Sequence, residues 1–347
     1  MNKQRLIVLF DGTWNDPQDQ TNVYRISRAL HDYDGTIRQR FYYDPGVGTA
    51  NSDRLRGGVF GLGLSKNLQE GYDWLAKKYA QGDEIWIFGF SRGAYTARSL
   101  VGMIRKCGLL HISTPSLLER AEKLYRNKKL APDCEECEKF RELYSRKVKI
   151  HFIGVWDTVG ALGIPGTLIS ERGVYSWHDT ELSSIVERAY QAAALDEFRG
   201  AYDISLWTYP GGVKKPSQLE VEQRWFIGAH ANVGGGYGED PLADISLRWM
   251  QEKAKAAGLC LDLVAVKEHA WRANPEPSFK QFLFGFYAFF SKTFSKGDGK
   301  NYRKYALGLN GNEAVNVTTD ESVWNRWQEK EFAYRPRTLV DAKQEPV

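Results

Sequence analysis

The chain has 347 residues, of which 42% are hydrophobic and 26% are charged, a balance typical of a soluble globular protein with a sizeable core. Its formal net charge of +4 is small for this length and no dense lysine and arginine block occurs, so nucleic-acid binding is not predicted. Four cysteines are too few for a disulfide scaffold. Cys134 and Cys137 have a CxxC spacing, but no second pair and no flanking histidine complete a zinc site. We interpret them as ordinary thiols on a charged helix.

The N-terminal apolar run at 6–10 is too short for a signal-peptide core, and Asp11 interrupts it. We therefore interpret it as the first β-strand. No other run reaches the length of a membrane-spanning helix. The expectation from the sequence is a cytoplasmic protein without a signal peptide or a transmembrane segment.

The first half of the chain alternates between strand and helix patterns. Glycines recur from Gly57 to Gly63, but a phosphate-binding P-loop needs a lysine after its last glycine, and Leu64 stands there instead. We expect a structural or active-site-lining loop at this place. The patterns predict strands at 6–10, 40–43 and 84–88, and helices at 22–30, 64–79 and from about 92 to 107.

The second half begins with a charged, helical stretch at 110–147, which we interpret as an inserted helical cap. Strands follow at 148–156 and 223–228, and a helix at about 242–256. Strands that alternate with helices predict an open α/β sheet, mostly parallel and flanked by helices. We expect a single α/β-hydrolase-like domain over residues 1–347.

The strand at 84–88 leads into Gly-Phe-Ser-Arg-Gly and then into a helix, which is the pattern of a nucleophile elbow. The turn between strand and helix is so sharp that we expect a strained backbone at Ser91. Gly89 and Gly93 leave room for it, since a Cβ at either place would crowd the opposite arm of the turn. The serine hydroxyl would then lie at a helix N-terminus, where backbone N–H groups favour developing negative charge.

A serine nucleophile needs a base, and the base needs an orienting acid. His230 follows a hydrophobic strand and precedes the glycines at 234–236, so we predict that it is the base. Asp157 ends a strand between the serine and the histidine, in the Ser…Asp…His order of α/β-hydrolases, and is the predicted acid. His151 falls within a strand pattern and is interpreted as a packed side chain. The alternative acids are Asp196, Asp240 and Asp244, and the histidines interpreted as surface or capping residues are His31, His111, His178 and His269.

The tetrahedral oxyanion of such a reaction needs two hydrogen-bond donors. We expect one from the backbone N–H of Arg92, the residue after the nucleophile, and the other from Gly12 or Thr13 after the first strand. Asp11 would shape that loop through hydrogen bonds. Gly234 would line the active site beside the histidine. This chemistry requires neither a metal nor another cofactor.

Phe-Asp-Gly-Thr at 10–13 also invites comparison with the haloacid dehalogenase phosphatases, whose nucleophilic aspartate lies two residues before the aspartate of Asp-Gly-Thr. That position is Leu9, which cannot attack a phosphate. This alternative is therefore disfavoured.

Four motifs together resemble the DUF2235 family of α/β-hydrolases, which includes the phospholipase effectors of type VI secretion systems. They lie at 10–15, 89–98, 155–160 and 225–237, and shorter likenesses occur at 194–197, 322–323 and 334–336. The resemblance implies a Ser91–Asp157–His230 hydrolase acting on phospholipids, export by a type VI secretion system, and a secretion-system or immunity partner. Two features depart from the family pattern, namely Ala231-Asn232 in place of Ser-Asp after the histidine, and the lack of the large extra region of the longer effectors.

Aromatic residues recur at helical spacing over 279–296, with lysines between them. Such a helix either packs on the sheet or lies in a membrane interface, with aromatics toward the lipid and lysines near anionic headgroups. The candidate membrane-contacting residues are Phe282, Phe286, Phe289 and Phe290. A further alternative for the whole chain is a non-catalytic membrane- or protein-binding module on a hydrolase fold.

Overall fold

The computed structural model describes residues 3–12, 20–46, 59–159, 181–209, 215–276, 300–308 and 311–346. In these residues seven strands form one sheet, every neighbouring pair is parallel, and the order is β2–β1–β3–β6–β7–β8–β9. The predicted α/β-hydrolase-like architecture with a mostly parallel sheet is thus confirmed. The strands are β1 (Gln4–Phe10), β2 (Arg38–Asp44), β3 (Glu84–Phe90), β6 (Phe152–Trp156), β7 (Arg188–Ala194), β8 (Glu220–Phe226) and β9 (Val317–Thr319).

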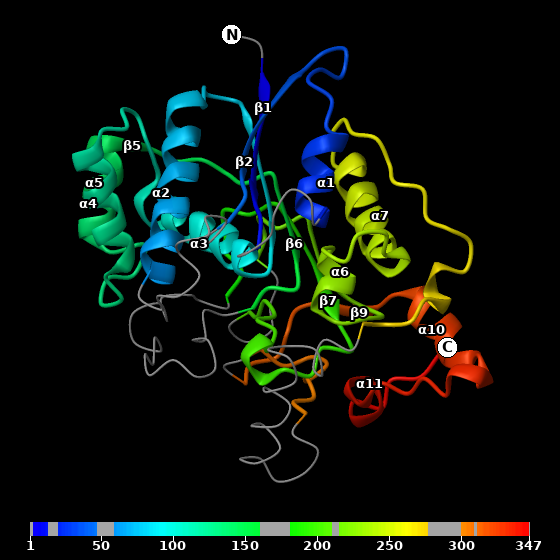
Figure 1. Cartoon of the computed structure of the whole chain (residues 1–347). Coiled ribbons are helices and arrows are strands. Elements are labelled where there is room, and N and C mark those ends of the chain that lie inside the picture. The colour runs from blue at the N-terminus through cyan, green and yellow to red at the C-terminus, as the bar shows by residue number, and fades with distance from the viewer. Residues whose placement is uncertain are drawn as a thin grey trace.

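Helices cover both faces of the sheet (Figure 1). One face carries α1 (Asn22–Ala29) and α7 (Pro241–Ala256), and the other carries α2 (Val59–Lys78) and α3 (Arg92–Cys107). The remaining elements are α4 (Pro115–Arg126), α5 (Glu135–Tyr144), α6 (His230–Gly234), α10 (Glu321–Gln328), α11 (Arg337–Asp341), the short strands β4 (Leu109–Leu110) and β5 (Ser145–Arg146), and the 3₁₀ turns η2 (Gly200–Tyr202), η4 (Ala270–Arg272) and η6 (Lys330–Phe332).

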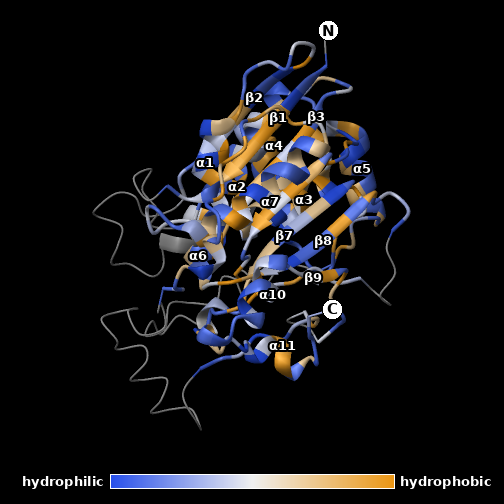
Figure 2. Ribbon diagram, turned by 90° about the vertical axis from the view of Figure 1, so that its right-hand side faces the viewer, coloured by the Kyte–Doolittle hydropathy of each residue, from blue (hydrophilic) through white to orange (hydrophobic). Residues whose placement is uncertain are grey.

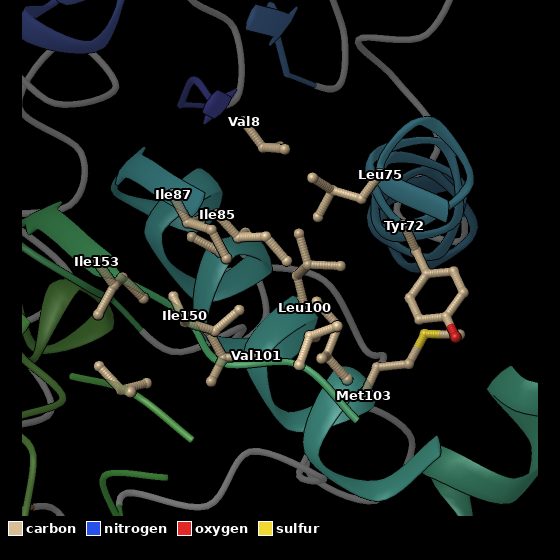
Figure 3. Packing of buried hydrophobic residues seen from close by; sticks show 14 of the residues in the cluster. Val8, Tyr72, Leu75, Ile85, Ile87, Leu100, Val101, Met103, Ile150 and Ile153 are labelled. Atoms are coloured by element: carbon tan, nitrogen blue, oxygen red, sulfur yellow. The ribbon is translucent and has the colours of Figure 1, made fainter. Parts of the chain in front are cut away.

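The two faces explain why the central strands read as unbroken apolar runs (Figure 2). Successive side chains of a strand point to opposite faces. Leu6 and Val8 accordingly pack with α2 and α3, whereas Ile7 and Leu9 pack with α1 and α7. Figure 3 shows the first of these clusters, with Val8, Ile85 and Ile87 meeting side chains of α2 and α3. Each such burial contributes about 1.5–3 kcal/mol, so both faces anchor the sheet.

The inserted stretch at 110–147 contains α4 and α5, which pack beside α2 and α3 as an outer layer. Lys106 Nζ donates to the carbonyls of Tyr125 and Asn127, and Arg141 Nη1 donates to the carbonyl of Lys106 at 2.8 Å. These bonds lie at the C-terminal end of α3, away from Ser91. The insertion therefore flanks the sheet beside α2 and α3.

Several element boundaries differ from those expected. The strand predicted at 148–156 begins at Phe152, and His230 begins α6 instead of following directly on a strand, since β8 ends at Phe226. Two strands of the seven-stranded sheet were not predicted, β7 and β9, and neither were the short strands β4 and β5. The aromatic stretch 279–296 lies outside the described residues, as do its four candidate phenylalanines. Among the helices that the structure describes, none combines the length and the apolarity needed to cross a bilayer.

Strand order reverses direction at β1. The chain first places β2 on one side of β1 and then β3 on the other, and it continues outward from β3. Ligands of open α/β sheets bind at such switch points, beyond the carboxyl ends of the strands. Asp11 and Ser91 directly follow β1 and β3, so the fold predicts a ligand-binding site at this edge of the sheet.

Candidate active site

Ser91 lies between β3 and α3 with φ 59° and ψ −122°, a strained conformation for a residue with a side chain. A Cβ at Gly89 would lie 2.7 Å from Cα of Ala94, on the opposite arm of the turn. A Cβ at Gly93 would instead overlap the carbonyl oxygens of Phe10 and Asp11 at the end of β1. We expected a Cβ at Gly93 to crowd the opposite arm of the turn, and this is corrected. The absence of a Cβ at Gly93 instead lets α3 pack closely against the end of β1.

Three side chains from distant parts of the sequence form a continuous hydrogen-bonded chain. His230 Nε2 lies 2.7 Å from Ser91 Oγ, and His230 Nδ1 lies 2.5 Å from Asp157 Oδ2. Asp157 follows β6 directly, has φ 40°, and also accepts from the backbone N–H of Ala194 at 2.9 Å. The ends of β3 and β6 and the start of α6 thus bring the serine, the aspartate and the histidine into contact.

Electrostatics keep the aspartate ionised and the histidine neutral. Burial raises the pKa of Asp157, but the charge of Arg303 and the hydrogen bond from His230 outweigh it, so the pKa of that carboxyl lies well below its usual range. Burial lowers the pKa of His230 below its ordinary 6.5, against the opposing effect of Asp157. A neutral imidazole bonded to a carboxylate can accept the serine proton.

Aromatic rings hold the imidazole from two sides. The Phe90 ring lies 4.7 Å from the His230 ring, and Tyr202 meets it edge-on at 5.0 Å. A Cβ at Gly234 would overlap the Phe90 ring, so this glycine leaves the space that Phe90 fills. Gly234 acts indirectly, by letting Phe90 pack against the imidazole.

Arg303 was missed by the sequence analysis. Its guanidinium grips both oxygens of Asp157, with Nη1–Oδ1 at 2.6 Å and Nη2–Oδ2 at 3.0 Å. It comes from the segment 300–308, which has no strand or helix pattern and no motif around this arginine. Its sequence position therefore gave no signal.

The loop that follows β1 was expected to supply an oxyanion donor, and Asp11 and Gly12 at its start are described by the structure. Asp11 does shape the loop, because it accepts from Thr21, Tyr43 and the backbone N–H of Gly12. The Gly12 N–H, which we expected to serve as an oxyanion donor, donates to Asp11 Oδ1 at 2.7 Å in this structure. Thr13 lies outside the described residues. Arg92 is the first residue of α3, next to Ser91.

The alternative acids have other partners. Asp196 accepts from the Gly228 N–H at 2.7 Å and from the Tyr334 hydroxyl at 2.8 Å. Asp240 caps α7 and accepts from Asn232 at 2.8 Å. Asn232 also accepts from the Ala229 N–H and so closes the first turn of α6. Asn232, one of the two residues that depart from the family pattern, thus supports the helix that starts at the histidine. Asp244 pairs with Arg25.

The remaining candidates stand elsewhere. His151 precedes β6 and contacts Glu187 and the carbonyl of Ala257. Leu9, at the position of the phosphatase nucleophile, is fully buried among the side chains of α1 and α7. His31 pairs with Asp262, the backbone N–H of His111 donates to the Tyr144 carbonyl, His269 packs near Trp271, and His178 lies outside the described residues.

The chain is similar to several proteins of known sequence or structure. An uncharacterized protein of Saccharomyces cerevisiae is 32% identical over 225 residues, which are 57% of this chain and 32% of the relative. A crystal structure of an uncharacterized protein from Pseudomonas aeruginosa is 20% identical with a TM-score of 0.45, over 75% of this chain and 47% of that one. The Tle1 effector, solved bound to the VgrG spike of the type VI secretion system, is 19% identical with a TM-score of 0.41, over 70% of this chain and 53% of that one.

The chain thus spans about a third of the yeast relative and about half of each of these two structures. A family model also matches most of the chain. The model for the type VI secretion system phospholipase effector Tle1-like catalytic domain matches residues 4–253, a range that contains Ser91, Asp157 and His230. The chain therefore belongs to the Tle1-like catalytic domain family of type VI secretion phospholipase effectors.

Proposed function

We propose that the protein is a serine hydrolase of carboxylic esters, with Ser91 as nucleophile, His230 as base and Asp157 as orienting acid. The observation that carries the proposal is the position of His230, whose two ring nitrogens bond to Ser91 and Asp157 at 2.7 and 2.5 Å. A nucleophile, a base and an orienting carboxylate in mutual hydrogen-bond reach are the signature of this chemistry.

The reaction follows from that arrangement. Ser91 Oγ attacks the ester carbonyl carbon while its proton passes to His230 Nε2, which gives a tetrahedral oxyanion. The carbon–oxygen bond to the alcohol then breaks, and the imidazolium protonates the departing alkoxide. Water attacks the acyl-enzyme by the same route, releases the carboxylic acid and restores the serine hydroxyl. Asp157 stays ionised and stabilises the imidazolium in both halves.

The oxyanion requires donors beside Ser91. The Arg92 N–H, at the N-terminus of α3, is the first donor that we propose, and the helix N-terminus adds favourable electrostatics. The Gly12 N–H donates to Asp11. We therefore assign the second donor to the Thr13 backbone. Loss of one such donor typically lowers kcat by roughly 10²–10³.

The substrate class rests on family membership. The matched family consists of phospholipase effectors, so we propose a phospholipid acyl ester as substrate and a phospholipase A-like cleavage. The Tle1 effector was solved on a VgrG spike, and an analogous secretion-system partner, export, and an immunity partner are proposed for this chain. Membrane contact through residues 279–296 remains part of the same proposal.

A fluorophosphonate probe tests the nucleophile. We expect the purified protein to be labelled covalently, and a Ser91→Ala variant to be unlabelled with ester turnover lower by roughly 10⁶. Ser217→Ala is the matched control, because Ser217 bonds to the Ser184 carbonyl ahead of β8, at the opposite end of the strands from Ser91. It should be labelled like the wild type. Equal labelling of Ser91→Ala and the wild type would show that Ser91 is not the nucleophile.

The alternative is a non-catalytic membrane- or protein-binding module. It predicts liposome binding that survives Ser91→Ala and no turnover of any lipid or soluble ester. The departure from the family pattern at Ala231-Asn232 is one motive for this alternative, but Asn232 stabilises the turn that carries His230. Efficient turnover of a soluble ester would remove this alternative.

A further inference from the structure

The acid of the candidate site is held by a second cation besides the histidine. Arg303 has 3% of its surface exposed, and it donates to the carbonyls of Ala194 at 2.8 Å and Tyr202 at 2.5 Å as well as to both oxygens of Asp157. Asp157 Oδ2 accepts from Arg303 Nη2 and from His230 Nδ1 at once. One carboxylate oxygen thus couples the arginine to the imidazole.

This arrangement differs from a simple serine–histidine–aspartate chain in its charge. An aspartate with 0% exposure and only a histidine as partner would place its full negative charge on the imidazolium. A bidentate guanidinium neutralises much of that charge and fixes the plane of the carboxylate. The Asp157 carboxylate is then oriented by the backbone N–H of Ala194 and by the arginine, independently of the histidine.

The other charged groups around the imidazole form their own pair. Glu197 accepts from the His230 backbone N–H at 3.4 Å, and it binds Arg199 through two contacts of 2.6 and 2.8 Å. The guanidinium of Arg199 lies 3.8 Å over the Tyr202 ring. The groups that face His230 are therefore Asp157 with Arg303, Glu197 with Arg199, Tyr202 and Ser91.

We propose that Arg303 is a positioning residue of the hydrolase, which clamps the Asp157 carboxylate toward His230 and tempers its charge; the inference rests on the proposed function. The clamp has two consequences. It orients the carboxylate for turnover. It also disfavours the imidazolium relative to the neutral base, so that His230 can still accept a proton in mildly acidic solution. Arg303 lies beyond residues 4–253 that match the family model.

The test compares kcat and KM for a soluble ester over a range of pH in the full chain and its variants. In Arg303→Gln the unshielded carboxylate stabilises the imidazolium, so the acid limb of kcat/KM moves up by about one unit or more, the size typical of a charge within 4–6 Å. The plateau of kcat falls by at least roughly 10-fold, short of the roughly 10⁴-fold loss known when the triad acid is made an amide. KM should change little.

Two further variants separate positioning from mere stability. Arg303→Lys keeps the charge but loses the two-point grip, so its acid limb stays at the wild-type midpoint while kcat falls. Arg326→Gln is the matched control, since Arg326 is buried and donates to the carbonyls of Trp271 and Ala273 without touching Asp157 or His230. Arg326→Gln should lower Tm and leave both kcat and the acid-limb midpoint of kcat/KM unchanged.

Each outcome decides something. A folded Arg303→Gln with the wild-type acid limb overturns the proposal, and if that variant does not fold, Arg303→Lys with full wild-type kcat overturns it instead. A wild-type protein that neither turns over esters nor takes the fluorophosphonate label refutes the proposed function and this inference with it. An active wild type whose arginine variants behave like the control refutes the inference alone.

Discussion

Asp157 is an ionised side chain with no exposure to solvent, and such a charge is stable only when it is paired and hydrogen-bonded. Its two oxygens receive four contacts of 3.0 Å or less, from His230, the Ala194 N–H and both terminal nitrogens of Arg303. Removal of one partner from a buried pair typically costs about 3–5 kcal/mol. The same contacts that stabilise the charge also orient it.

The histidine makes a pH prediction at this scale. His230 must be neutral to accept the serine proton, and burial lowers its pKa below the ordinary 6.5. Activity is therefore present where the imidazole is neutral and is lost as the pH falls through the pKa of His230 in the folded enzyme, which lies below 6.5. We expect kcat/KM for a soluble ester to show an acid-limb midpoint below 6.5. A midpoint above that value would mean that the imidazolium is stabilised, contrary to this account.

The side chains at the site were foreseen to different degrees. Ser91, Asp157 and His230 stand in short motifs in a fixed chain order, and these motifs carried the prediction that they meet. Arg303 reaches Asp157 across 146 residues, and nothing local distinguishes it from other arginines. The Gly12 N–H was assigned by analogy of position. Only the three-dimensional contact with Asp11 shows that it is engaged.

At the scale of elements, the close approach of α3 to β1 sets the position of the nucleophile. Gly93, in the first turn of α3, lies against the carbonyls that end β1. In Gly93→Ala the added methyl must push helix and strand apart, which should destabilise the fold by about 1–3 kcal/mol and shift Ser91. Urea unfolding and the rate of fluorophosphonate labelling measure the two effects.

Gly102→Ala is the control for that change. Gly102 lies in the same helix, and the three atoms nearest to an added Cβ there all belong to the Tyr125 side chain, with the hydroxyl oxygen nearest at 3.0 Å. The phenol can shift, and alanine favours the helix by about 1 kcal/mol over glycine. This variant should keep its stability within about 1 kcal/mol and its labelling rate. If Gly93→Ala had the same free energy of unfolding and the same labelling rate as Gly102→Ala, Gly93 would not position α3 against β1.

The elements that sequence patterns missed share a physical cause. Strand β7 is rich in alanine, which has low strand propensity, yet it lies inside the sheet between β6 and β8 and contacts α7. Strand β9 has three residues and gives too short a pattern to detect. Helix α6 has five residues and is held by the Asn232 side chain. Long periodic segments such as α3, in contrast, were placed to within a residue or two.

For the molecule as a whole, the reversal of strand order next to β1 explains why residues so distant in sequence share one site. The carboxyl ends of β1, β3 and β6 lie side by side, and their following residues are Asp11, Ser91 and Asp157. Helix α6, after β8, adds His230 from the α7 side of the sheet. The site is thus a property of the topology.

The substrate belongs to this scale too, because lipid access depends on surfaces around the site. The proposed membrane-contacting phenylalanines lie outside the described residues, and the lipid substrate is supported by family membership. The chemistry and the substrate are therefore separable claims. A soluble ester tests the first, and a phospholipid tests both.

The most direct measurement is mass spectrometry of a mixed phospholipid extract before and after incubation with the purified protein. The account predicts loss of diacyl phospholipids with matching release of lysophospholipids and free fatty acids. It also predicts no change with Ser91→Ala and full turnover with Ser217→Ala. Phospholipids left intact by a wild-type protein that hydrolyses soluble esters would contradict the substrate. The same products from Ser91→Ala would contradict the nucleophile, and with it the proposed mechanism.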